Sequence, residues 1–96
     1  MSLNQKTEEF YIRLKEQLTN QTLWPTHYLF KFIVPTDDEK IAQIKQAFEN
    51  QDAQIETKSS SNGNYTSVSV KVKMKNPDRV IEKYLEVSYI EGIISL

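Results

Sequence analysis

Residues 52–74 read DAQIETKSSSNGNYTSVSVKVKM and predict a β-hairpin. Asn62-Gly63 near the middle suits the two positive-φ positions of a type I′ turn, and the residues after it alternate between polar and apolar. A hairpin alone cannot bury its apolar face, so we expect the rest of the chain to cover it.

The register of the hairpin follows if Asn62 and Gly63 are the two loop residues. One face then holds three pairs: Ile55 with Val70, Thr57 with Val68, and Ala53 with Val72. The other face holds two pairs, Asp52 with Lys73 and Glu56 with Ser69. No like charges oppose one another, so the register is self-consistent.

The segments before the hairpin predict a helix and a strand. Helix-forming residues run from about Leu3 to Leu18, with one apolar stripe: Phe10, Tyr11, Leu14 and Leu18. Trp24-Pro25 favours an extended chain, because a residue that precedes proline avoids the α region. Residues 27–34 are rich in aromatic and β-branched side chains, which predicts a strand, and their apolar character on both faces places it at the centre of a sheet.

Two further helices and a last strand complete the expected order. Thr36 and Glu39 have the spacing of a capping box for a helix that reaches about Asn50. Asn76-Pro77 is typical of a helix start, with asparagine as N-cap. Residues 89–96 predict a final strand that Gly92 interrupts.

The order β-α-β-β-α-β after an N-terminal helix predicts a single α+β domain over residues 1–96, a ferredoxin-like sandwich with sheet order 4-1-3-2. Both core helices would cover one face of the sheet. We expect the inward side chains of the first strand to be Tyr28, Phe30, Phe32 and Val34. The open face would carry Leu29, Lys31 and Ile33, and it is left for the N-terminal helix of this chain or a neighbour, for a partner, or for water.

Composition narrows the classes of function. The 96 residues carry 12 basic and 13 acidic side chains, a net charge of −1, so no overall field favours nucleic acid or anionic lipid. The chain has no cysteine, which fits a reducing compartment, and no apolar run approaches the length of a membrane span, so we expect a cytoplasmic protein.

Three segments together resemble the YbeD-like bacterial family, a small domain of unknown function. They lie at residues 24–31, 58–69 and 80–85, within a resemblance that covers about residues 23–96. The most specific is Ser-Ser-x-Gly-x-Tyr-x-Ser-Val at Ser60 to Val68, followed by Pro-Thr-x-x-x-x-Lys at Pro25 to Lys31. This chain departs from the family pattern at Ser59, where proline is common, and in its N-terminal helix over residues 1–20.

The resemblance implies a ferredoxin-like fold related to ACT-type regulatory domains, which bind amino acids beside metabolic enzymes. A binding or regulatory role follows from it, with no established ligand, cofactor or catalytic residue. A fold alone is a weak guide to function.

Two groups of residues are candidates for binding a ligand or a partner. The first is Leu29, Lys31 and Ile33, where a lysine in mid-sheet could meet a carboxylate or phosphate, or simply extend into solvent. The second lies around the hairpin turn: Ser60, Ser61, Gly63, Tyr65 and Ser67. These hydroxyls and amides could bind an anion, or could serve the turn alone.

Other sites find little support in the sequence. Lys71, Lys73 and Lys75 suggest an RNA-binding strand, but the aromatic motifs of such sheets are missing. His27 is the only histidine, so neither a metal cluster nor a Ser/His/Asp catalytic set is expected. Helix capping accounts for the carboxylates of residues 37–39.

The main hypothesis is therefore a non-enzymatic regulatory or adaptor module that associates with a protein, or with itself as a homodimer, through the open sheet face. An ACT-like sensor of an amino acid or organic acid is the alternative. Weak RNA binding is a third hypothesis, and no cofactor or membrane partner is expected.

Overall fold

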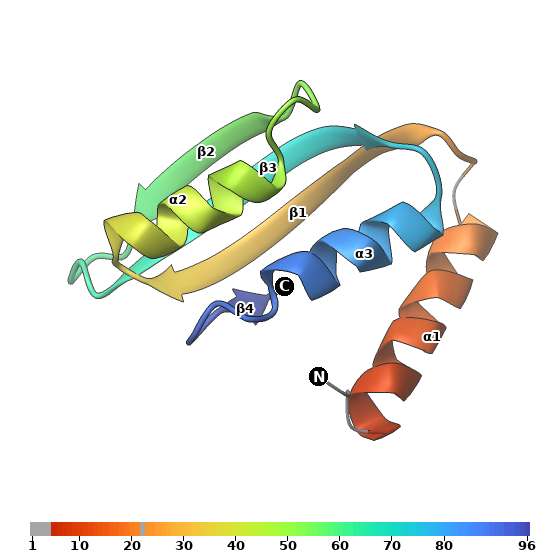
Figure 1. Cartoon of the computed structure of the whole chain (residues 1–96), viewed down its shortest axis with the longest axis horizontal. Helices are drawn as coiled ribbons and strands as arrows, with labels where there is room; N and C mark the ends of the chain where they lie inside the picture. Colours follow the sequence, from red (N-terminus) through yellow and green to blue (C-terminus); the bar gives the residue numbers. More distant parts are fainter. Residues whose placement is uncertain (1–4, 22) are drawn as a thin grey trace.

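The computed structural model describes residues 5–21 and 23–96, which form a four-stranded antiparallel sheet and three helices (Figure 1). The elements, in chain order, are α1 (Gln5–Gln21), β1 (Thr26–Pro35), α2 (Asp38–Ala47), β2 (Gln54–Ser59), β3 (Tyr65–Met74), α3 (Pro77–Val87) and β4 (Ile94–Ser95). The sheet order is β2-β3-β1-β4, which reads 4-1-3-2 from the β4 edge. β1 is thus a central strand, as its apolar composition predicts.

The hairpin of β2 and β3 has the predicted register within its ladder. Ile55 pairs with Val70, Thr57 with Val68, and Glu56 with Ser69. β2 begins at Gln54 because the turn that follows α2 places Asn50 and Asp52 at positive φ, 65° and 53°. The expected pairs of Ala53 with Val72 and of Asp52 with Lys73 therefore lie outside the β2–β3 ladder.

The prediction of a type I′ turn is wrong. Only Gly63 has a positive φ, 75°, whereas Asn62 does not. Ser60 N–H donates to the Tyr65 carbonyl at 2.8 Å, and Gly63 N–H donates to the Ser60 carbonyl at 3.0 Å. The side-chain oxygen of Asn62 accepts from Asn64 N–H at 3.0 Å, so its amide organises a longer loop without a left-handed backbone.

The core lies between the sheet and the layer formed by α2 and α3. Phe30, Phe32 and Val34 are fully buried, as predicted, and Tyr28 is half-buried. The Phe30 ring centroid lies 5.0 Å from that of Phe48, at the end of α2. Each such aromatic side chain contributes about 1.5–3 kcal/mol by leaving water, so this row joins the helices to the sheet.

The helix caps are partly as expected. The Asn76 side chain accepts from Arg79 N–H at 3.0 Å, which confirms the N-cap of α3. The N-cap of α2 is Asp37, which accepts from Glu39 N–H at 2.9 Å. The Thr36 capping box is therefore a wrong prediction, because the Thr36 hydroxyl instead forms a 2.9 Å hydrogen bond with the buried Thr66.

The final strand is much shorter than the expected residues 89–96. Ile90 is buried in the core, and Gly92 turns the chain with a φ of 81°. Only Ile94 and Ser95 pair with β1, opposite Ile33 and Phe32. The left-handed glycine explains the difference, because the chain reaches the sheet only after it.

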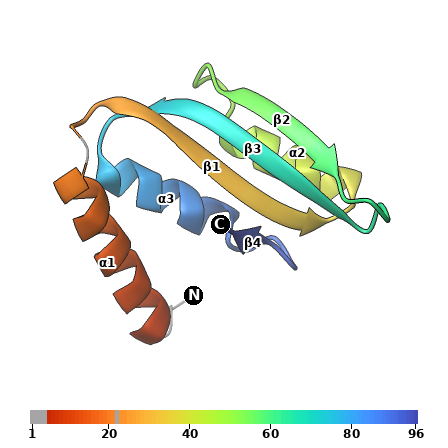
Figure 2. The same ribbon diagram turned by 180° about the vertical axis from the view of Figure 1, so that it is seen from behind.

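Helix α1 packs beside α3 and crosses none of the strands in either view (Figures 1 and 2). Lys15 Nζ lies 2.7 Å from an Asp78 carboxylate oxygen at the start of α3. Three side chains of the expected stripe pack against the core: Tyr11, Leu14 and Leu18. The apolar stripe of an amphipathic helix is expected to be buried, but Phe10 of this stripe is 60% exposed, so the expectation is wrong for that residue. Within the described chain, α1 does not cover the open face of the sheet.

Candidate functional site

The first candidate residues lie together on the open face of the sheet, seen from in front in Figure 2. Leu29 is 58% exposed, Lys31 is exposed and Ile33 is half-buried. The register places Leu29 opposite Lys71, Lys31 opposite Ser69 and Ile33 opposite Ser67. Ile94 of β4 lies beside Ile33 and is 52% exposed. Apolar and basic side chains therefore alternate along β1.

The open face is positively charged. Four lysines project from it, and one carboxylate, Glu56, accompanies them. The four are Lys31, Lys58, Lys71 and Lys73. The ion pairs found among the described residues use none of these five side chains. Four positive charges and one negative leave an excess of three on this face, although the whole chain has a net charge of −1.

The second group of candidates lines a shallow groove of about 500 Å³ at the end of the hairpin. Its lining is Ile33, Lys58, Ser59, Ser60, Ser61, Tyr65 and Ser67. The structure therefore brings Ile33 from β1 next to the hairpin residues. Gly63 lies outside this lining, and so do Leu29 and Lys31.

The hydrogen bonds of the hairpin turn use several of its polar groups internally. The Ser60 hydroxyl lies 2.9 Å from the Asn62 side-chain oxygen and accepts from Tyr65 N–H at 3.1 Å. The Ser67 hydroxyl donates to the Lys58 carbonyl at 3.4 Å. The hydrogen bonds found among the described residues do not use the Lys58 ammonium or the hydroxyls of Ser59 and Ser61, which line the groove with the ring of Tyr65, a residue that is 49% exposed.

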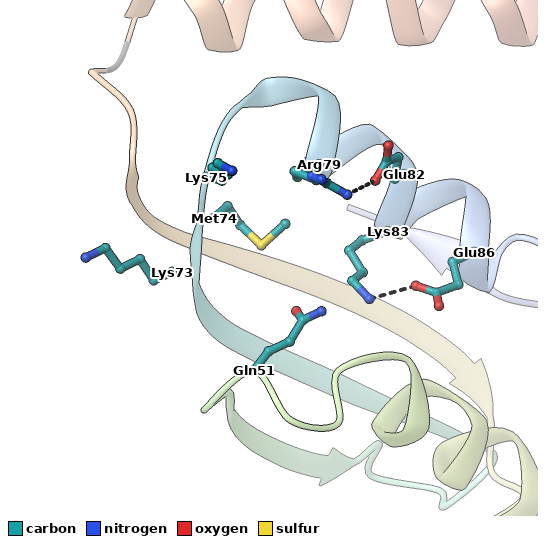
Figure 3. A pocket seen from close by; sticks show the side chains of 8 residues that line it. All are labelled: Gln51, Lys73, Met74, Lys75, Arg79, Glu82, Lys83 and Glu86. Carbon is teal, nitrogen blue, oxygen red and sulfur yellow. Dashed lines mark hydrogen bonds and ion pairs between the residues drawn. The ribbon is translucent and has the colours of Figure 1, made fainter.

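A second groove, of about 580 Å³, was not expected from the sequence (Figure 3). It lies between the end of β3, one face of α3 and Gln51. Its lining is Gln51, Lys73, Met74, Lys75, Arg79, Glu82, Lys83 and Glu86. Lys73 points away from the other side chains in Figure 3. The Arg79, Glu82, Lys83 and Glu86 spacing indicates a shared helix face, but no local pattern shows that Gln51 lies opposite it.

Most charges of this second groove are already paired. Arg79 Nη1 lies 3.2 Å from a Glu82 oxygen, and Lys83 Nζ lies 2.8 Å from a Glu86 oxygen. The Lys83 ammonium also donates to the Ala47 carbonyl and lies 5.4 Å from the Phe48 ring centroid. Lys83 therefore anchors α3 to the end of α2 and is poorly placed to bind a ligand.

A small apolar cavity of about 120 Å³ separates α1 from the sheet and α3. At its base the hydroxyls of Tyr28 and Tyr84 form a hydrogen bond of 2.9 Å. Burial, assisted by the Tyr28 hydroxyl, raises the pKa of Tyr84. Burial also raises the pKa of Tyr11, on the facing side of α1. Both phenols are therefore neutral at physiological pH.

The described residues contain no group of three or more histidine, cysteine, aspartate or glutamate side chains that could hold a metal ion. His27 is an exposed residue of β1 opposite Lys73. Across the described residues, no helix has the length and apolar character needed to cross a membrane.

Comparison with known proteins relates the fold to a family. Two solved structures are similar to this chain. One is protein HP0495 from H. pylori, with 20% identity and a TM-score of 0.69, over 79% of this chain and 86% of that one. The other is the ACT domain of GTP pyrophosphokinase from Chlorobium tepidum, with 14% identity and a TM-score of 0.53, over 74% of this chain and all of that one. At these identities both show a shared fold alone, and no curated protein matches the chain.

Residues 19–96 match the family described as "Protein of unknown function (DUF493)". This match covers the sheet, α2 and α3, and it leaves most of α1 outside. It confirms the resemblance to the YbeD-like family, which is the same family. The chain therefore belongs to the DUF493 family.

Proposed function

We propose that this chain is a small regulatory or adaptor domain that binds a protein partner through the open face of its sheet. One observation carries the proposal: the helices pack on the opposite face, and Leu29 and Ile33 flank Lys31 on a surface that no described element crosses. Exposed apolar groups among charges are typical of interaction surfaces.

The charge of the open face specifies the chemistry of the partner. Because the face carries an excess of three positive charges, the partner surface would present carboxylates around an apolar centre. Two copies that met through this face would bring their lysines together, so the charge disfavours open-face self-association. Nucleic acid is less well supported, because Leu29 and Ile33 cannot stack bases and Tyr65 lies at the end of the sheet.

A photo-crosslinking amino acid at position 29 tests this proposal in cells. The control places the same amino acid at Glu39, an exposed residue of α2 on the other side of the sheet. We expect one discrete protein adduct from position 29 alone, which is lost when Lys31→Glu and Lys71→Glu are combined with the crosslinker. The same adducts from both positions, or none from position 29, would refute the proposal. An adduct at twice the 11.2 kDa monomer would indicate self-association instead.

An ACT-like sensor of a small organic anion is the second candidate. The groove at the end of the hairpin supports it, because Lys58 and Tyr65 line that groove, and the solved ACT domain has a similar fold. A thermal-shift screen with amino acids and organic acids tests it, since a ligand at 100 times its Kd adds about 2.7 kcal/mol of stability. A hit must be lost in Lys58→Ala, and an absence of hits would remove this candidate.

A further inference from the structure

Strand β2 is the outermost strand of the sheet, with no described element beyond it in either view (Figures 1 and 2). The hydrogen bond from Ser60 N–H to the Tyr65 carbonyl shows which residues near β2 direct their backbone groups toward β3. Groups alternate along a strand, so Lys58, Glu56 and Gln54 also bond toward β3. The backbone N–H and C=O groups of Ile55, Thr57 and Ser59 consequently point away from the sheet and are available to another strand.

Two opposite charges flank the middle of this edge. Glu56 and Lys58 stand on either side of Thr57, and both side chains project from the open face. The ion pairs found within the described chain use neither of them. The outer edge of β2 therefore has unpaired backbone N–H and C=O groups. It also has a negative charge on one side of Thr57, at Glu56, and a positive charge on the other, at Lys58.

We propose that two copies of this chain pair through β2, antiparallel, about a two-fold axis at Thr57. Thr57 then faces its own copy, Ile55 faces Ser59, and these three cross-strand pairs supply about six backbone hydrogen bonds. Glu56 of each copy faces Lys58 of the other, at the closely spaced positions where side chains meet. Such an interface is closed and self-complementary, so it ends at a dimer.

Electrostatics select this register over its neighbours. If the two-fold axis passed through Glu56, the outward N–H and C=O groups of the two copies could still form hydrogen bonds. Glu56 of one copy would then lie opposite Glu56 of the other. Moving the axis to Lys58 puts Lys58 opposite Lys58. Like charges directly opposite each other destabilise a ladder, whereas the Thr57 register has two opposite-charge pairs. The charged residues thus prevent misregistered association, the usual purpose of charges on an edge, while favouring one arrangement.

The arrangement has a structural consequence. A two-fold axis perpendicular to the sheet joins the two sheets into one of eight strands, with both open faces on the same side and the helices on the other. Two lysine-rich faces would then lie next to each other on one continuous surface. The dimer contact itself lies at the edge and is independent of what binds the open face.

Charge exchange on the full-length chain tests the proposal, with mass measured by light scattering or sedimentation over a range of concentrations. The wild type is expected to approach twice its 11.2 kDa monomer mass as concentration rises. Glu56→Lys alone and Lys58→Glu alone each create two like-charge contacts, so each should raise the dimer dissociation constant at least tenfold. A mixture of these two variants restores both pairs and should form a heterodimer. The double exchange, Glu56→Lys with Lys58→Glu, should dimerise like the wild type.

A backbone variant provides an independent test. Thr57→Pro removes an N–H that points outward, so it spares the β2–β3 ladder but breaks the ladder between copies. Circular dichroism and urea unfolding should show a folded chain, and light scattering should show a monomer. A wild type that stays at 11.2 kDa at millimolar concentration would overturn the proposal. So would a dimer unaffected by Thr57→Pro, or a mixture of the two charge variants that does not associate.

Discussion

Replacing Gly92 by alanine should destabilise this fold more than the same replacement at Gly63, although both glycines have a similar positive φ, 81° and 75°. A Cβ atom at Gly63 would meet nothing within 4 Å. At Gly92 it would lie 2.8 Å from Cγ and 3.0 Å from Cδ of Pro35, at the end of β1. Alanine at either position would have to adopt an unfavourable positive φ. Only at Gly92 would its Cβ atom also clash with a neighbouring side chain.

The left-handed conformation costs a residue with a Cβ about 1–2 kcal/mol. Forcing an extra carbon against a rigid ring adds about 1–3 kcal/mol, as in overpacked cores. We therefore expect the free energy of unfolding to fall by about 1–2 kcal/mol for Gly63→Ala and by about 2–4 kcal/mol for Gly92→Ala. In a domain of this size the second change lowers Tm by at least about 8 °C.

Urea unfolding followed by circular dichroism measures both values by linear extrapolation. Repeating the Gly92 replacement in a Pro35→Ala background isolates the contact, because that background lacks Cγ and Cδ. The excess cost at Gly92 should then disappear. Equal costs for the two glycines, or an excess that persists without the proline ring, would refute this account of how the chain reaches β4.

Three further predictions concern helix ends and buried hydroxyls. Asn76→Ala should lower the free energy of unfolding by about 1 kcal/mol in urea titrations, because Arg79 N–H loses its cap. Lys15→Ala should change it by less than about 1 kcal/mol, because the ion pair with Asp78 is exposed. Burial raises the pKa of Tyr84, so its contribution is complete below about pH 10 and is lost at higher pH, where the unfolded chain loses the proton first. Urea midpoints between pH 8 and pH 11 should show this fall, and Tyr84→Phe should reduce it.

The sequence predicts the sheet and its register because they follow from local alternation. Ile55 faces the same side as the buried Val68 and Val70 only when β2 and β3 pair as observed, since a slip by one residue would turn Ile55 to the open face. The open face follows from the same alternation, which places Leu29, Lys31 and Ile33 on it.

The alternation of polar and apolar residues does not distinguish between two local structures that differ in a single hydrogen bond. Asn-Gly is compatible with a type I′ turn, but the side-chain oxygen of Asn62 accepts a backbone N–H and removes the need for a positive φ there. Thr36 and Asp37 can both cap a helix, and the choice depended on Thr66, which is distant in sequence and supplies a partner for the Thr36 hydroxyl. Such choices depend on contacts that no local pattern contains.

The sequence alone determined the order of elements, the buried residues of β1, the pairing of β2 with β3, and the family, because each depends on periodicity or on a contiguous motif. Tertiary structure alone decided three other features: the packing of α1 beside α3, the length of β4, and the grooves. An amphipathic stripe specifies that a helix face is buried without specifying against which surface. That choice depends on contacts between distant segments, such as those of Lys15 with Asp78 and of Gly92 with Pro35.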